Sequence, residues 1–336
     1  MKILSFGEIM MRLTPPDYLT LEQAQQLNLS FVGTGVNLLS SLARFGHETT
    51  LLSKVPDNAL GRAATATMRK LGIGDRLIGY TGNHMGSFFV EMGHGNRPTE
   101  VTYQNRLNGS FCTAPVASYD LKAAVGAVDA VHICGITLSL TDQTRETALA
   151  LAKIAHEAGK FVCFDFNYRP SLNTQNDTQT MRAYYLEMLA YCDLVFGSAR
   201  DLTDLLGFEK DDALSEKAQL EAFCKQLMAA YGVKQFAGTL RKGSGIDAEL
   251  TGFYGVDGAL HLTKPYTLTL LDRIGSGDAF AAGIINGHFK QWEHARTTEF
   301  ATVASVLAHD TNGDVPMSSE VQIENYMKDP TATLMR

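Results

Sequence analysis

The sequence Leu271-Asp272-Arg273-Ile274-Gly275-Ser276-Gly277-Asp278-Ala279-Phe280 separates two segments of different character. The mostly apolar residues 267–271 predict a buried strand, and the small and apolar residues 279–289 predict a helix. Small residues such as Gly283 and Gly287 would let this helix lie close to a sheet. The two glycines and the serine therefore stand where a strand is expected to turn into a helix.

This junction predicts an anion-binding site. Gly275 and Gly277 can expose backbone N–H groups, and a helix N-terminus carries a positive partial charge of about half a unit. Asp278 would lie beside the anion in the first helical turn, where we expect its carboxylate to stay ionised at neutral pH. Amide donors for phosphate oxygens and a carboxylate that accepts a hydroxyl proton suit phosphoryl transfer. The alternative is structural, because acids also occur in the first turn simply to complement the helix dipole.

Composition limits the class of protein. The chain has 336 residues, of which 45% are hydrophobic, so a sizeable core is expected. Its net charge of −7, without a basic block, argues against nucleic acid as a partner. The N-terminus reads as a strand rather than a signal peptide, and no apolar run approaches the length of a membrane span. Five scattered cysteines without a C-x-x-C pair predict reduced core thiols in a cytoplasmic protein.

Strands that alternate with helices predict an α/β fold. From Ala130 onward the alternation is regular, with strands expected near residues 130–134, 161–166, 194–197 and 235–240. This order predicts a mostly parallel central sheet covered by helices on both faces, within one domain over residues 1–336. Short extended pieces lie within about residues 10–32 and 86–112. These two insertions are expected to form a small β-strand lid.

The signature D-R-I-G-S-G-D-A-F-A-A-G resembles that of the ribokinase-like (PfkB-type) carbohydrate kinases. Within that family, the arginine at Arg273 looks most like the 2-keto-3-deoxygluconate kinases. The pattern differs from a Walker loop, since G-x-x-x-x-G-K-[ST] is absent, and from a dinucleotide fingerprint, since the third glycine is missing. The resemblance covers nearly the whole chain. It implies a ribokinase-like three-layer sandwich with a lid, and a homodimer formed through that lid.

The resemblance also implies an activity. It implies ATP-dependent phosphorylation of a small sugar acid, 2-keto-3-deoxygluconate, to its 6-phosphate. Asp278 would accept the hydroxyl proton, and the N–H groups of Gly275, Ser276 and Gly277 would stabilise the transferred phosphate. Mg²⁺ would be held mainly by the nucleotide phosphates and water, because no protein cage for it is visible in the sequence. The alternatives are another sugar kinase of the family, such as a fructokinase, or an inactive relative that binds sugar or nucleotide.

Two segments outside the signature resemble sugar-binding elements of the family. Gly33 and Asn37 fit the end of a Gly-Gly-x-x-x-Asn element in which Val32 replaces the first glycine. Asn37 could instead cap the helix predicted at 38–45. Arg169 closes a D-x-N-x-R pattern after a strand and would reach the sugar acid and the γ-phosphate. The alternative for Arg169 is a solvated loop charge.

The expected lid carries three further candidates for the sugar side. Phe88 stands where many relatives have a substrate-facing tyrosine, although it could equally be a packing residue. Tyr103 and Arg106 resemble a Tyr-x-Arg pair that contacts the substrate carboxylate, but the arginine comes one residue late. Because a shift of one residue reverses the face of a strand, either Asn105 takes the expected place or a bulge restores Arg106.

The nucleotide would contact two other strand ends. Ser198 and Asp201 resemble the Asn-x-x-Glu element of the family, although a serine cap with an acid three residues later explains them locally as well. Thr239, Gly243 and Gly245 resemble the glycine-bearing nucleotide loop. The register of that loop stays open.

Overall fold

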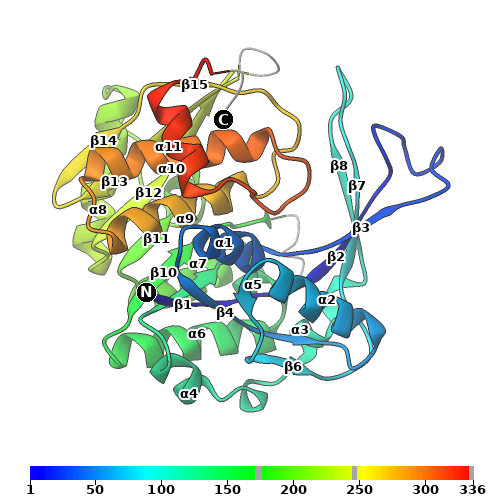
Figure 1. The fold of residues 1–336 in the computed structure, drawn as a ribbon. Coiled ribbons are helices and arrows are strands. Elements are labelled where there is room, and N and C mark those ends of the chain that lie inside the picture. Colours follow the sequence, from blue (N-terminus) through cyan, green and yellow to red (C-terminus); the bar gives the residue numbers. More distant parts are fainter. Residues whose placement is uncertain (171–175, 244–247, 333–336) are drawn as a thin grey trace.

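A central sheet organises the protein, whose computed structural model describes residues 1–170, 176–243 and 248–332. Figure 1 shows this sheet between two layers of helices. Its strands are β1 (Lys2–Phe6), β4 (Glu48–Val55), β5 (Ile73–Gly74), β6 (Ile78–Tyr80), β9 (Ala130–Cys134), β10 (Phe161–Asp165), β11 (Leu194–Phe196), β12 (Gln235–Lys242), β13 (Glu249–Val256), β14 (Ala259–Leu262) and β15 (Tyr266–Thr267). The order is β14-β13-β12-β11-β10-β9-β1-β4-β5, with β15 beside β13 and β6 beside β4.

The sheet is mostly parallel, as the sequence predicts. Strands β12, β11, β10, β9, β1 and β4 pair in parallel, and β13 runs antiparallel to β12. Strand β1 shows why both faces are covered, since Ile3 packs into one hydrophobic cluster while Leu4 and Phe6 pack into another. Alternate residues of a strand point to opposite faces, so apolar side chains at successive positions require a layer on each side.

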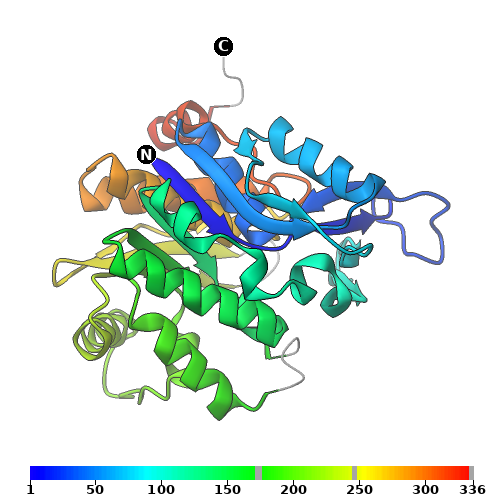
Figure 2. The same ribbon diagram turned by 90° about the horizontal axis from the view of Figure 1, so that it is seen from below.

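Helices supply both layers. They are α1 (Thr34–Arg44), α2 (Ala59–Lys70), α3 (Ser110–Thr113), α4 (Leu121–Gly126), α5 (Ile136–Leu140), α6 (Asp142–Glu157), α7 (Thr178–Leu189), α8 (Glu216–Tyr231), α9 (Ser276–Phe289), α10 (His294–His309) and α11 (Glu320–Lys328). Figure 2 shows α6 and α7 (green) on one side of the sheet and α9 and α10 (orange) on the other. Thr141 caps α6 by accepting a hydrogen bond from the Thr144 N–H.

A second sheet of four strands is built from the two predicted insertions. It contains β2 (Met10–Thr14), β3 (Asn28–Val32), β7 (Ser87–Glu91) and β8 (Glu100–Gln104) in the order β3-β2-β7-β8. In Figure 1 this small sheet projects to the right of the main body. Its own apolar cluster consists of Met10, Val32, Phe88, Val90 and Met92, with Ile274 and Val315 packed against it. The small sheet therefore rests on two loops that flank α9 and α10.

The predicted strand at 267–271 is wrong. Only Tyr266–Thr267 form a strand, and the side chains of Leu270 and Leu271 are each 41% exposed. Their apolar character reflects surface residues of a loop, which hydrophobicity alone cannot distinguish from a short strand. Helix α9 follows this loop and begins at Ser276, and α11 is a further helix beyond the last one that the sequence predicts.

Helix α9 packs on strand β12 of the sheet, as expected, but its two glycines Gly283 and Gly287 contact a helix. A Cβ atom on Gly283 would lie 2.5 Å from the Ala301 Cα, and one on Gly287 would lie 2.4 Å from the Thr297 Cγ2. Both partners belong to α10, so these glycines allow two buried helices to pack closely. The five cysteines are all buried and free, as predicted. No helix within the described residues is both long and apolar enough to cross a membrane.

Candidate active site

A cavity of about 750 Å³ opens at the carboxyl ends of the central strands, beside the small sheet. Ligands of open α/β folds bind at this edge of the sheet. Most of the residues that the sequence predicts for a site line it. They are Gly33, Asn37, Phe88, Tyr103, Arg106, Arg169, Ser198, Asp201, Thr239, Gly275, Ser276, Gly277 and Asp278. Segments far apart in the chain therefore meet in one place.

The start of α9 forms the floor of this cavity. Gly275 adopts a left-handed conformation with φ of 85°, which favours glycine, and it precedes the first helical residue. The N–H groups of Ser276, Gly277 and Asp278 belong to the first turn, where an α-helix offers no acceptor of its own. A Cβ atom on Gly277 would meet no atom within 4 Å, so the space next to these amides is open. This turn has the form of an anion-binding site.

Asp278 is buried beside the turn and is held by Asn37. The Asn37 Nδ2 donates a hydrogen bond of 2.7 Å to the Asp278 Oδ2. Asn37 lies inside α1, with its N–H bonded to the Gly33 carbonyl, so the alternative that it caps a helix at Leu38 is wrong. Gly33 makes room here, because a Cβ atom on it would lie 2.1 Å from the Glu8 carbonyl oxygen.

The ionised state expected of Asp278 at neutral pH stays a prediction, but the surroundings of this carboxyl group act on its pKa. Burial raises its pKa well above the usual range, and the nearby carboxylates of Asp165 and Asp314 raise it further. The hydrogen bond from Asn37 and the positive charge of Arg169 oppose this shift. A carboxyl group in such surroundings is a stronger base once it has lost its proton, which suits proton abstraction.

Asp165 is a site residue that the sequence motif contained but that we did not single out. It ends β10 and lines the cavity, and burial together with the Asp201 carboxylate raises its pKa to about 7. Arg169, four residues later, lowers the pKa of Asp165, Asp201 and Asp278. Arg169 lines the cavity near these three carboxyl groups, although its side chain is exposed.

Arg106, and not Asn105, is the residue that lines the cavity at the end of β8. Asn105 follows the strand with φ of 48°, and this left-handed residue turns the chain so that Arg106 is buried at the start of a short 3-10 helix. The Arg106 Nε donates a hydrogen bond of 2.8 Å to the Glu8 Oε2. Glu8, which the sequence did not indicate, thereby fixes the guanidinium and leaves its two terminal nitrogens without a protein partner among the described residues.

The two aromatic candidates lie next to Arg106. The guanidinium carbon of Arg106 is 5.2 Å from the centre of the Tyr103 ring, and the Tyr103 and Phe88 rings are 5.8 Å apart. Phe88 is also part of the apolar cluster of the small sheet, so it packs and lines the cavity at once. This side of the cavity combines one cation with apolar surface.

The opposite side carries the residues predicted for the nucleotide. The Asp201 Oδ2 accepts hydrogen bonds from the Ser198 N–H at 2.8 Å and the Ser198 Oγ at 2.7 Å, so the local capping arrangement is present as well. Thr239 lines the cavity from β12, whereas Gly243 follows β12 outside the cavity lining. Gly245 lies outside the described residues.

Two further arginines line this side of the cavity. Arg241 and Arg273 both carry exposed side chains, and the charge of Arg273 lowers the pKa of Arg241, after burial as the main cause. Neither has an acidic partner within the described residues. Two facing cations without a counter-ion favour an anionic ligand such as a polyphosphate.

Residues 1–320 match the family described as pfkB family carbohydrate kinase. The chain belongs to that family. A candidate 2-keto-3-deoxygluconate kinase from Enterococcus faecalis shares 49% identity and a TM-score of 0.96, over 100% of this chain and 98% of that one. A 2-dehydro-3-deoxygluconokinase from Thermotoga maritima shares 28% identity and a TM-score of 0.91, over 97% of both chains.

A relative from Haloferax volcanii is similar by sequence. It is named 2-dehydro-3-deoxygalactonokinase and is 25% identical, over 100% of this chain and 99% of its own length. The family match and the two similar solved structures, which cover 100% and 97% of this chain, confirm the fold and family expected from the signature.

Proposed function

We propose that this pfkB-family kinase transfers the γ-phosphoryl group of ATP to the terminal hydroxyl of 2-keto-3-deoxygluconate. The observation that carries the proposal is Arg106, a buried guanidinium at the cavity with two nitrogens free for a carboxylate. The similarity to proteins named for this substrate supports the same choice. Neutral sugars, in contrast, would offer no carboxylate to the two terminal nitrogens of Arg106, which Glu8 leaves unbonded among the described residues.

The reaction uses the start of α9. Asp278 accepts the proton of the sugar hydroxyl, and the hydroxyl oxygen forms a bond to the γ-phosphorus. The bond from that phosphorus to the bridging oxygen of ATP breaks, and ADP leaves. The N–H groups of Gly275, Ser276 and Gly277 donate to the oxygens of the transferred group, whose negative charge they stabilise in a site shielded from water.

The residues on the nucleotide side fit ATP and Mg²⁺. Arg241 and Arg273 offer charge for the phosphates, and Ser198 and Thr239 offer hydroxyl groups. The carboxylates of Asp165 and Asp201 are hard oxygen donors of the kind that Mg²⁺ prefers, and we place them near the ion through water. When bound, Mg²⁺ supplies neutralisation of the phosphate charge.

The small sheet would act as a lid over the sugar. Phe88, Tyr103 and Arg106 reach the cavity from this sheet or from the residues that follow it, so closure would exclude water from the acceptor hydroxyl. The exposed strands of the sheet offer a surface for a homodimer. The five buried free thiols fit the reducing cytoplasm, where we place the protein.

A coupled ATP assay tests the substrate. The panel contains 2-keto-3-deoxygluconate, its C4 epimer 2-keto-3-deoxygalactonate, and fructose as a neutral sugar. We expect turnover of the acids, and we expect Arg106→Gln to lower kcat/KM for them by roughly 10- to 100-fold, the worth of hydrogen bonds to a charged group. Arg97→Gln, on the loop between β7 and β8 and outside the cavity, is the control. Preference for fructose would favour the fructokinase alternative.

Asp278→Asn tests the chemistry. The variant keeps the shape of the side chain but cannot accept the proton, so kcat should fall by roughly 10²- to 10⁴-fold while the fold persists. Circular dichroism and a thermal melt check the fold. Near-normal turnover would remove Asp278 from the role of base, and binding of ATP without any turnover in the unmodified protein would favour the inactive relative.

A further inference from the structure

Arg12 is an arginine with only 2% of its side chain exposed, and it joins the small sheet to two distant loops. From β2 its Nη2 donates to the Asp272 Oδ2 at 2.8 Å, and its Nη1 bonds to the Asp314 Oδ1. The Nε donates to the Thr14 Oγ1 at 3.0 Å, and Nη2 also contacts the Met92 sulfur at 3.4 Å. The guanidinium thus has partners on all three nitrogens.

Both carboxylate partners of Arg12 hold the turn that begins α9. The Asp272 Oδ1 accepts a hydrogen bond of 3.1 Å from the Ile274 N–H, one residue before Gly275. The Asp314 carbonyl oxygen lies against Gly275, where an added Cβ atom would come within 1.8 Å of it. The position of Gly275, and with it the amides of the first turn, is therefore set by the two residues that Arg12 bridges.

Apolar contacts reinforce the same connection. Ile274 and Val315 pack against the apolar cluster of the small sheet, and each is close in sequence to one of the two carboxylates. The ion cluster and these two side chains together tie the small sheet, which carries part of the sugar side, to the turn that would hold the phosphate. A shift of the loop that contains Asp272 and Ile274, or of the loop that contains Asp314 and Val315, would therefore disturb both the sugar side and the phosphate side of the cavity.

We propose that Arg12 is a positioning residue that locks the Gly275–Gly277 turn to the small sheet, so that amide donors and sugar pocket share one geometry. Asp272 and Asp314 are 3% and 5% exposed, and without a cation they would be unpaired carboxylates beneath the phosphate site. The inference rests on the proposed function for its kinetic test, but it does not depend on which sugar acid is the acceptor.

The test compares variants of Arg12 with a variant of a second buried arginine, Arg145, which serves as the control. Arg12→Met keeps much of the volume but removes the bridge, and we expect kcat to fall about 10²-fold with little change in KM, as for a misplaced catalytic group. Arg12→Lys keeps the positive charge but lacks the planar guanidinium. Its kcat should therefore lie between that of Arg12→Met and that of the unmodified protein. Its milder change also keeps the inference testable if Arg12→Met does not fold.

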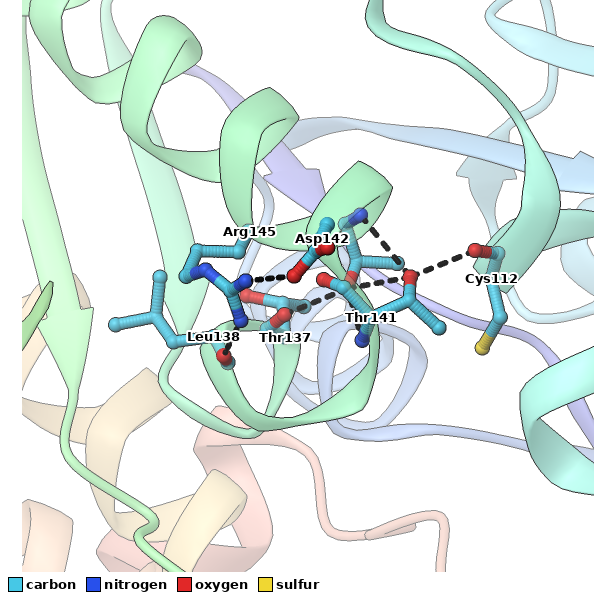
Figure 3. Close-up of polar contacts among 7 residues, drawn as sticks. Cys112, Thr137, Leu138, Thr141, Asp142 and Arg145 are labelled. Carbon is cyan, nitrogen blue, oxygen red and sulfur yellow. Dashed lines mark hydrogen bonds and ion pairs between the residues drawn. The ribbon is translucent and has the colours of Figure 1, made fainter. Parts of the chain in front are cut away.

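Arg145→Met is the matched control. Figure 3 shows Arg145 bonded to Asp142 and to the Leu138 carbonyl, and its side chain is 8% exposed and outside the cavity lining. We expect this variant to lose thermal stability but to keep kcat. An Arg12→Met variant that loses stability to the same extent and keeps its kcat would overturn the inference, since Arg12 would then be structural only.

A crystal structure of Arg12→Met gives a second readout that is independent of substrate. We expect Gly275–Gly277 to be displaced while the rest of α9 and the central sheet keep their places. A turn in its original position would overturn the inference. If the unmodified protein phosphorylates no sugar acid, the proposed function fails, and this structure still decides the role of Arg12.

Discussion

Asn37 shows how one amide side chain connects the sugar side of the cavity to the base. Its Nδ2 donates to Asp278, while its buried Oδ1 has no hydrogen-bond partner among the residues that the structure describes. A buried acceptor without a partner is costly, so the position favours a ligand hydroxyl that donates to it. The same side chain would then orient both the acceptor sugar and the carboxylate that takes its proton.

Replacing Asn37 by alanine should change the pH dependence of the reaction. Burial raises the pKa of Asp278 and the Asn37 hydrogen bond lowers it, so the loss of that bond raises the pKa further. Because Asp278 must be ionised to accept a proton, the acidic limb of the kcat profile should move to higher pH. The measurement is kcat across the pH range for Asn37→Ala beside the unmodified protein.

Ser41→Ala is the control for this prediction. Ser41 is buried on the same helix, one turn after Asn37, and does not line the cavity. Its variant should keep the original profile. An acidic limb that stays in place in Asn37→Ala, or one that moves to lower pH, would contradict the assigned interaction.

Site residues that belong to a local motif could be predicted from the sequence, whereas residues whose partners are distant in the chain could not. Asp278 and its glycines could be found because they follow one another in the chain. Glu8 and Arg12 could not, because their partners Arg106 and Asp314 are 98 and 302 residues away. A charged residue in a strand, such as Arg12, or in the loop beside one, such as Glu8, carries no local sign of the distant counter-ion with which it will be buried.

At the scale of secondary-structure elements, the close packing of helix α9 on helix α10 depends on glycine. Gly283 faces the Ala301 Cα so closely that a methyl group at this position would overlap backbone atoms. This packing holds the helix whose first turn forms the floor of the cavity. It is also a contact that the sequence misassigned, because small residues on a helix indicate close approach without naming the partner.

Gly283→Ala should destabilise the protein although alanine is the better helix former. Overpacking of this kind costs about 1–3 kcal/mol, against a gain in helix propensity of about 1 kcal/mol. We therefore expect a net loss in the free energy of unfolding by urea. Gly126→Ala in α4 is the control, since a Cβ atom there meets nothing within 4 Å and should be neutral or stabilising. Equal effects at both positions would contradict the packing argument.

Element prediction succeeded where the hydrophobic pattern and the structure agree. Residues 130–134 form β9 with the predicted bounds, because a mostly apolar run within a regular alternation of strands and helices favours a buried strand. The strand predicted at 267–271 failed because Leu270 and Leu271 are exposed on a loop, while Leu268 alone of the three leucines is buried. The arrangement of the small sheet followed from two insertions whose short strands could pair only with each other.

At the scale of the whole molecule, the edge strands of the small sheet present an exposed surface. All five residues of its edge strand β8 are exposed, and Leu29 on the opposite edge strand β3 is 52% exposed. Figure 1 shows the sheet projecting from the main body. Exposed edge strands pair readily with another chain, so a second copy of the protein is the partner that we propose for this sheet.

Light scattering after size exclusion tests that assembly. We expect twice the chain mass of 36.6 kDa for the unmodified protein, and a shift toward the single-chain mass for Leu29→Lys, because a buried lysine without a partner opposes association. Leu60→Lys is the control, since Leu60 is an exposed leucine of α2, 37% exposed and outside the small sheet. A single-chain mass for the unmodified protein at assay concentration would exclude the dimer. If Leu29→Lys and Leu60→Lys both kept the dimer mass, the interface would lie outside the small sheet.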